Sequence, residues 1–206
     1  MAISAQDKIM YVANKLGLST LKDMQGSTGA VYDVDTDLSG QIFSSASRHQ
    51  NPSVTNLNDN SFEVNEALLI ENISFYTYNV SGNSVLNFQQ SYGSNAVIVY
   101  DLVIGNKRVM KNTPVFAPGC PYTFANVGQK IAPILGVEPN FSSFPIPRHQ
   151  TFLEGVGILI PPQIEWSIDY RIFNMVTGAV ITPTSAKAIG CYLFGTRVLL
   201  NFNTSI

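Results

Sequence analysis

The residues with the clearest chemical potential are the two histidines, because histidine is the commonest general base and metal ligand near neutral pH. His49 and His149 each lie in an Arg-His-Gln tripeptide that follows a Phe-Ser-Ser sequence, "FSSASRHQ" and "FSSFPIPRHQ". The spacing and the sequences that follow differ, whereas true repeats carry the same structural unit in each copy. We therefore interpret Arg48, His49, Arg148 and His149 as parts of two polar contact loops.

Neither histidine has the neighbours that a metal site requires. A catalytic zinc ion needs about three protein ligands, and no carboxylate lies at a helical or strand offset from either histidine. Cys120 and Cys191 match no zinc motif and are expected to be free thiols. The sequence also lacks a Gly-x-Ser-x-Gly elbow and the glycine-rich loops that hold phosphates. It therefore predicts no metal and no cofactor.

Paired carboxylates are the remaining catalytic candidate. Glu154, Glu165 and Asp169 fall in the C-terminal strand region. Glu165 and Asp169 would share one face of a single strand at about 13 Å, judged from the rise per residue. A glycoside hydrolase needs its two carboxyl groups closer together than that. We therefore expect no enzymatic activity.

The composition indicates a surface that contacts other molecules. Charged residues make up only 13% of the 206 residues, hydrophobic residues make up 45%, and the net charge is -2. Free monomers usually keep a charged surface for solubility, whereas interface cores are depleted of charge. A dense basic patch, which direct nucleic-acid binding needs, is absent. No apolar run of about 18 residues is present, so no membrane span is expected.

The N-terminal region predicts one helix followed by an extended arm. Ser4 is a suitable N-cap with Asp7 three residues later, and Gly17 can end the helix. Its apolar residues recur at helical spacing: Ile9, Val12, Ala13 and Leu16. Residues 25–60 are rich in Gly, Ser, Asp and Asn without strong periodicity, which favours an arm that orders against a neighbouring molecule. The first residues lack the apolar core of a signal peptide, so synthesis in a reducing cytoplasm is expected. We predict an arm over 1–60 and a β-domain over 61–206.

From Phe62 onward the pattern is typical of strands. "ALLIENISFYTYNV", "SVLNFQQ", "NAVIVYDLVIGNKRVMK" and "QIEWSIDYRIFNMV" are rich in β-branched and aromatic residues, with turn signals at Gly105-Asn106 and Thr177-Gly178. About eight mostly antiparallel strands result, and no helix alternates with them. The fold class predicted is an all-β antiparallel sandwich behind a helical and extended N-terminal arm, with Trp166 in its core.

The stretches "NLNDNSFEVNEALLIENISFYTYNV" and "GVGILIPPQIEWSIDYRI" resemble the strand entry and the strand–Pro-Pro–strand hairpin of single jelly-roll virion proteins, including those of bacteriophages. The resemblance covers about residues 62–202. It implies a jelly-roll capsid or auxiliary capsid subunit that forms homo-oligomers and contacts other virion proteins, in a virion assembled in the host cytoplasm. The non-basic arm argues against direct genome binding.

Candidate subunit contacts are the apolar helix residues, the two Arg-His pairs and the loop aromatics: Ile9, Val12, Leu16, Arg48, His49, Tyr122, Phe124, Phe141, Phe144, Arg148 and His149. Two other hypotheses remain open. One is a carbohydrate- or receptor-binding β-sandwich on a larger assembly, using the loop "FAPGCPYTFANVG". The other is a small metal-dependent barrel enzyme of cupin type.

Overall fold

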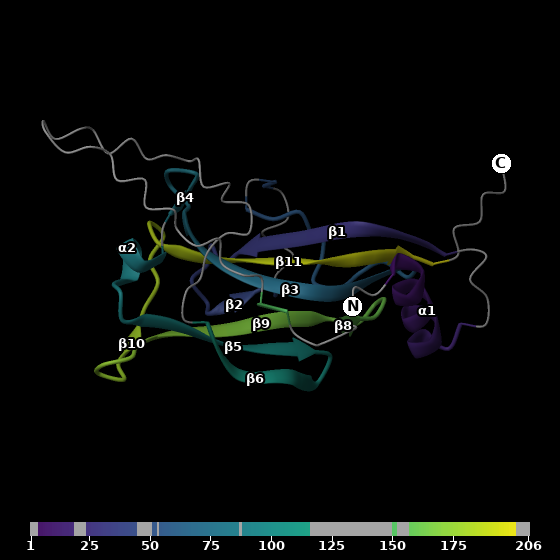
Figure 1. Cartoon of the computed structure of the whole chain (residues 1–206). Helices are drawn as coiled ribbons and strands as arrows, with labels where there is room; N and C mark the ends of the chain where they lie inside the picture. The colour runs from purple at the N-terminus through teal and green to yellow at the C-terminus, as the bar shows by residue number, and fades with distance from the viewer. Residues whose placement is uncertain are drawn as a thin grey trace, which may run out of the picture.

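The computed structural model of the chain describes residues 4–18, 24–44, 51–52, 54–86, 88–115, 150–151 and 157–200. Within them, two antiparallel sheets face each other across a hydrophobic core, and a helix lies at one end of the sandwich (Figure 1). The predicted all-β sandwich with a helix at its N-terminus is confirmed.

The first sheet, sheet A, is built on three long strands in the order β1 (Gln25–Val34), β11 (Ala188–Leu199) and β3 (Glu66–Asn79). Three short strands pair with β3 one after another: β8 (Ile158–Ile160), β7 (Gln150–Thr151) and β4 (Ser84–Leu86). They lie on the edge of β3 that β11 leaves free, because β11 pairs along nearly all of β3.

The second sheet, sheet B, has the order β10 (Val180–Ile181), β9 (Trp166–Asn174), β5 (Ala96–Ile104) and β6 (Lys107–Val115). The short β2 (Gln41–Ile42) also pairs with β9. Strands β5 and β6 form the predicted hairpin, with Ile104 opposite Lys107 around a two-residue turn. The "SVLNFQQ" segment is a strand only as far as Leu86, and α2 (Phe88–Tyr92) follows it, with Phe88 buried in the core.

The pairing of the eight main strands identifies the topology. The first of these strands in the chain pairs with the last, the second with the second last, and so on inward. The pairs are β1 with β11, β2 with β9, β3 with β8, and β5 with β6. The pairings β11–β3 and β9–β5 then join these hairpins into the two sheets. An eight-strand hairpin rolled up in this way is a jelly roll. The connectivity therefore fits the predicted antiparallel β-sandwich of about eight strands.

Aromatic side chains fill the space between the sheets. Trp166 is 2% exposed, and its ring lies 4.5 Å from that of Phe43 and 5.8 Å from that of Phe62. Further along the core, Phe75 of β3 and Tyr100 of β5 bring the two sheets together with ring centroids 4.9 Å apart. Each such pair adds about 1 kcal/mol to the free energy of unfolding beyond the burial of its area. The prediction that Trp166 is a core residue is confirmed.

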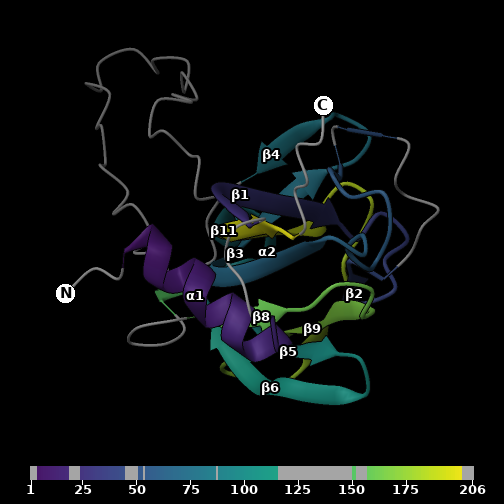
Figure 2. The same ribbon diagram turned by 90° about the vertical axis from the view of Figure 1, so that its right-hand side faces the viewer.

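Helix α1 (Ala5–Leu16) begins and ends at the residues that the sequence predicts. Ser4 and Asp7 form a reciprocal capping box, and Gly17 ends the helix in a left-handed conformation with φ 70°. The helix lies against one end of sheet A on the face turned away from the core (Figure 2). Ile9 packs directly over β1, where a side chain at Gly26 would come 2.7 Å from Ile9 Cδ1.

The described part of residues 25–60 belongs to the sandwich, which corrects the predicted arm. Strand β1 pairs with β11 along its whole length, from Gln25 opposite Leu199 to Val34 opposite Gly190. Ile42 and Phe43 are almost completely buried in the core. The first half of β1 is made of Gln, Gly, Ser and Thr and is largely exposed, so it shows no hydrophobic alternation in the sequence. The described residues before and after position 60 therefore share one sheet and one hydrophobic core.

Candidate functional site

Three of the predicted contact residues lie on α1, and the structure turns them toward the same chain. Val12 is completely buried, and Ile9 and Leu16 pack with it against the outer face of sheet A. We therefore no longer assign these three side chains to contacts with a neighbouring subunit. The other predicted contacts lie outside the described residues: Arg48, His49, Tyr122, Phe124, Phe141, Phe144, Arg148 and His149.

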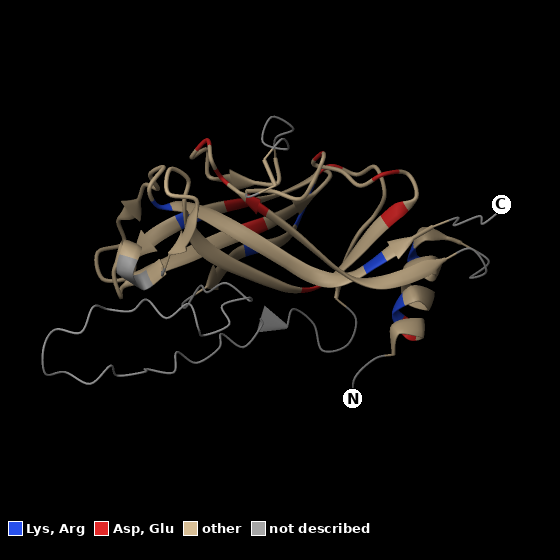
Figure 3. Cartoon of the chain, turned by 90° about the horizontal axis from the view of Figure 1, so that it is seen from above, with Lys and Arg blue, Asp and Glu red and all other residues tan. Residues whose placement is uncertain are grey.

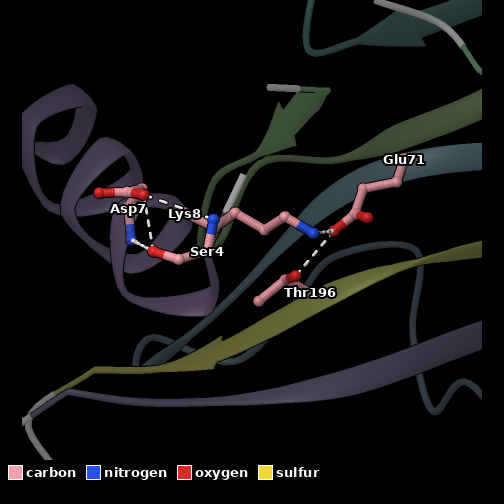
Figure 4. A network of polar contacts seen from close by, with 5 residues as sticks. All are labelled: Ser4, Asp7, Lys8, Glu71 and Thr196. Carbon is pink, nitrogen blue, oxygen red and sulfur yellow. Dashed lines mark hydrogen bonds and ion pairs between the residues drawn. The ribbon is translucent and has the colours of Figure 1, made fainter. Parts of the chain in front are cut away.

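A polar network fastens the same helix to sheet A (Figure 4). Lys8 Nζ donates to Glu71 Oε1 at 2.8 Å, and Thr196 Oγ1 donates to the same oxygen at 2.7 Å. The lysine and glutamate side chains are 19% and 26% exposed, so solvent screens this ion pair only in part. The contact fixes how α1 lies on the sheet, while the apolar cluster supplies most of the binding energy.

The described residues form one candidate binding hollow on the outer face of sheet B. It has a volume of about 310 Å³ and is lined by the turn before β2 and by β2, β9, β5 and β6: Ser39, Gly40, Gln41, Asp101, Arg108, Asp169, Tyr170 and Arg171. The hollow is an open depression rather than an enclosed cleft. Polar side chains dominate the lining, which distinguishes this region from the apolar core on the opposite face of the sheet.

Two carboxylates of the lining come from adjacent strands of sheet B. Asp101 of β5 and Asp169 of β9 are direct cross-strand partners. Like charges in this position normally destabilise a sheet. Asp101 is 5% exposed and accepts a hydrogen bond from the Asn112 backbone N–H at 2.5 Å, with the Arg108 guanidinium 3.3 Å away. Asp169 accepts from Gln41 Nε2 at 2.9 Å.

Strand β6 contributes Arg108 to the lining of the hollow, and its pairing with β5 is irregular. Two register shifts against β5 add two residues to β6 between Val103 and Tyr100. Such bulges bend an edge strand and redirect its side chains. At the second shift Asn112 adopts φ 46°, which Asn tolerates better than most residues. Its backbone N–H then reaches Asp101, while its side-chain Oδ1 accepts from Arg171 Nη2 at 2.8 Å.

A rigid turn between β1 and β2 supplies the remaining wall. The Asp35 carboxylate is completely buried and accepts hydrogen bonds from the Ser39 and Gly40 backbone and from the Tyr170 hydroxyl. Gly40 has φ 79°, and its carbonyl accepts from the Tyr170 backbone N–H at 2.8 Å. The buried carboxylate therefore fixes the backbone from which Gln41 reaches Asp169.

The charges in the hollow balance. Two aspartates and two arginines line it, so its lining carries no net charge at neutral pH. Elsewhere charged residues are sparse and widely spaced along the ribbon (Figure 3). The lining therefore contains carboxylate groups, which accept hydrogen bonds, beside guanidinium and amide groups, which donate them. No group of three or more His, Cys, Asp or Glu side chains in the described part of the chain is placed to hold a metal ion.

The sequence relates Asp169 only to Glu165 on the same strand, and that pair is too far apart for catalysis. Glu165 lies just before β9 and is exposed, while Asp169 faces Asp101 from another strand. Asp101 was missed because strand register decides which side chains meet, and register is not visible in one strand's sequence. The only local signal was the polar residue in the apolar run "AVIVYDLVI". Glu154 lies outside the described residues.

Comparison of the chain with protein families, with curated proteins and with solved structures finds no match in any of the three. None of the helices that the structure describes has the length and apolar character needed to cross a membrane. Any functional assignment therefore rests on the fold, the composition and the geometry of the site.

Proposed function

We propose that this chain is a structural subunit of a virion, such as that of a bacteriophage. It would be a capsid or an auxiliary capsid protein that assembles into symmetric homo-oligomers. The observation that carries the proposal is the jelly-roll strand pairing in a chain with only 13% charged residues. Jelly rolls occur in viral capsids, lectin domains and cupins. Sparse charge favours the first of these, because a surface buried against neighbours needs few charges.

The proposed role is mechanical and needs neither a catalytic group nor a cofactor. A closed sandwich provides a rigid body, and its turns and loops are free to contact neighbouring subunits. The subunit would assemble in the host cytoplasm with copies of itself and other virion proteins, without direct contact to the genome. The N-terminal helix then stabilises the subunit itself, because its apolar face packs on sheet A.

One exposed apolar turn supports contacts between subunits. The turn between β9 and β10 carries Met175 and Val176, which are 49% and 74% exposed, and Val180 at the start of β10 is 63% exposed. Asn174 orders this turn: its Oδ1 accepts from the backbone N–H groups of Val176 and Thr177, at 2.9 and 3.2 Å. A rigid turn loses little conformational entropy when it docks, so its apolar side chains are favourable interface anchors.

The test is the solution mass of the purified chain, measured by light scattering at several concentrations and followed by negative-stain imaging. The proposal predicts a stable oligomer or shell with cyclic or higher symmetry. A monomer at every concentration would contradict it. In that case the carbohydrate- or receptor-binding hypothesis becomes the leading one, because the polar hollow on sheet B is already present in a single chain.

A further inference from the structure

We propose that the hollow on the outer face of sheet B binds a neutral saccharide unit. Three features of the hollow carry this inference: a lining without net charge, donors and acceptors together in that lining, and hydrogen bonds that fix both kinds of group before any ligand arrives. The inference goes beyond an assembly role and does not depend on it.

The balance of charge selects the class of ligand. Asp101 and Asp169 contribute two negative charges, and Arg108 and Arg171 contribute two positive charges. A phosphate or nucleic-acid site would need an excess of cations, and a divalent cation would need an excess of oxygen ligands without nearby guanidinium groups. A neutral ligand leaves the existing balance undisturbed.

The arrangement of polar groups matches vicinal hydroxyls. Each hydroxyl of a sugar donates one hydrogen bond and accepts others. The Asp169 carboxylate can accept from a hydroxyl, while the Arg108 and Arg171 guanidinium groups can donate to hydroxyl oxygens at the margin. Hydrogen bonds to charged groups are roughly twice as strong as those between neutral groups. A hydroxyl between Asp101 and Asp169 would also separate two like charges that the sheet places opposite each other.

Asn112 holds both kinds of group in place. Its backbone N–H fixes Asp101, and its side-chain oxygen fixes Arg171, which also stacks against the Phe173 ring at 5.7 Å. Preorganised groups lose little freedom on binding, which raises affinity. We therefore assign Asn112 as a positioning residue and Asp169 as a ligand-contacting residue of the proposed site.

The direct test uses saturation-transfer NMR on the full chain with four neutral monosaccharides, namely glucose, galactose, mannose and N-acetylglucosamine. Anionic N-acetylneuraminic acid is the comparison ligand, and each sugar is at millimolar concentration. We expect at least one of the neutral sugars to give a signal. Asp169→Asn should weaken that sugar's affinity about tenfold or more, because it removes a charged acceptor. Asn112→Gly keeps the left-handed backbone and its N–H but releases Arg171, so it should lower affinity without unfolding the chain.

The matched control is Glu165→Gln, which removes one carboxylate charge just before β9 from an exposed residue outside the hollow. It should leave sugar binding unchanged, and the thermal midpoints of all three variants should stay near that of the parent chain. Three results would overturn the inference: no signal from any neutral sugar, a signal from anionic N-acetylneuraminic acid alone, or a signal that Asp169→Asn and Asn112→Gly leave unchanged.

Different measurements test the assembly proposal and the saccharide site, so either can be contradicted while the other stands. Monosaccharide binding is a property of one hollow, so it should be the same in a monomer and in an oligomer. Binding to a surface coated with many copies of the sugar depends on how many hollows one particle carries. A monomer that gives the monosaccharide signal would therefore contradict the assembly proposal and leave the saccharide site supported.

Discussion

At the scale of single residues, the carboxylate of Asp35 organises the turn between β1 and β2. It is fully buried and accepts from Gly40 N at 2.7 Å and from the Tyr170 hydroxyl at 2.9 Å. Asp35→Ala leaves these donors without an acceptor, so the free energy of unfolding should fall by about 3 kcal/mol. Urea denaturation measures the change. Asp37→Ala, an exposed aspartate in the same turn, is the control and should cost much less.

The Cys191 thiol gives the protein a sensitivity to alkaline pH. It is free and buried, and burial raises its pKa well above the ordinary value, with the nearby Asp33 carboxylate raising it further. Because the unfolded thiol ionises from about pH 8.5, unfolding releases a proton above that pH. The free energy of unfolding should therefore fall as pH rises, by up to about 1.4 kcal/mol per pH unit.

Urea denaturation between about pH 8.5 and 10 tests this expectation, since tyrosines ionise only from about pH 10 in an unfolded chain. Cys191→Ala should lower stability at pH 7 through the cavity that it leaves, and it should flatten the decline with pH. An equally steep decline in the variant would assign the effect to other groups. The native thiol should also resist alkylation, because the thiolate is the reactive form.

At the scale of elements, strand β1 and the residues after it should be indispensable to the fold. A chain lacking residues 1–60 loses β1, β2 and core residues that include Ile42 and Phe43. It should fail to show cooperative unfolding by circular dichroism. A chain lacking residues 1–18 loses only α1 from the described elements, so it should keep the sandwich and expose the apolar cluster of Leu69 and Val198. If both truncated chains fold equally well, residues 25–60 are not part of the core.

The contrast between β1 and β3 shows what the sequence can predict. Strand β3 is visible because β-branched and aromatic residues fill it from Glu66 to Asn79. Strand β1 is equally well paired but contains Gly, Ser and Thr, and its partner β11 lies more than 150 residues away in the chain. The helix is predicted correctly to its caps, because capping depends on neighbouring residues alone. The hollow depends on the register between strands that are distant in the chain. The sequence therefore shows which polar residues are present, but it does not show which of them lie next to one another.

At the scale of the whole molecule, the two outer faces of the sandwich differ. The outer face of sheet A carries two apolar clusters: α1 packs on one, and Val54 packs in the other beside Tyr76 and Tyr78. The outer face of sheet B carries the polar hollow. In a shell built from this subunit, we therefore expect the hollow to face solvent, because burial against a neighbour would desolvate its charges.

The exposed turn between β9 and β10 then becomes the place to test assembly by mutation. Val176 is 74% exposed, and Val176→Asp would put a charge into any interface formed there, at a cost that should weaken association at least tenfold. Light scattering should show a lower mass at a given concentration, while the thermal midpoint of the dissociated subunit stays unchanged. Val64→Asp is the matched control, since Val64 is 65% exposed in the turn before β3. Equal effects of the two substitutions would show that any added surface charge impairs assembly, and no effect of Val176→Asp would exclude this turn as the contact.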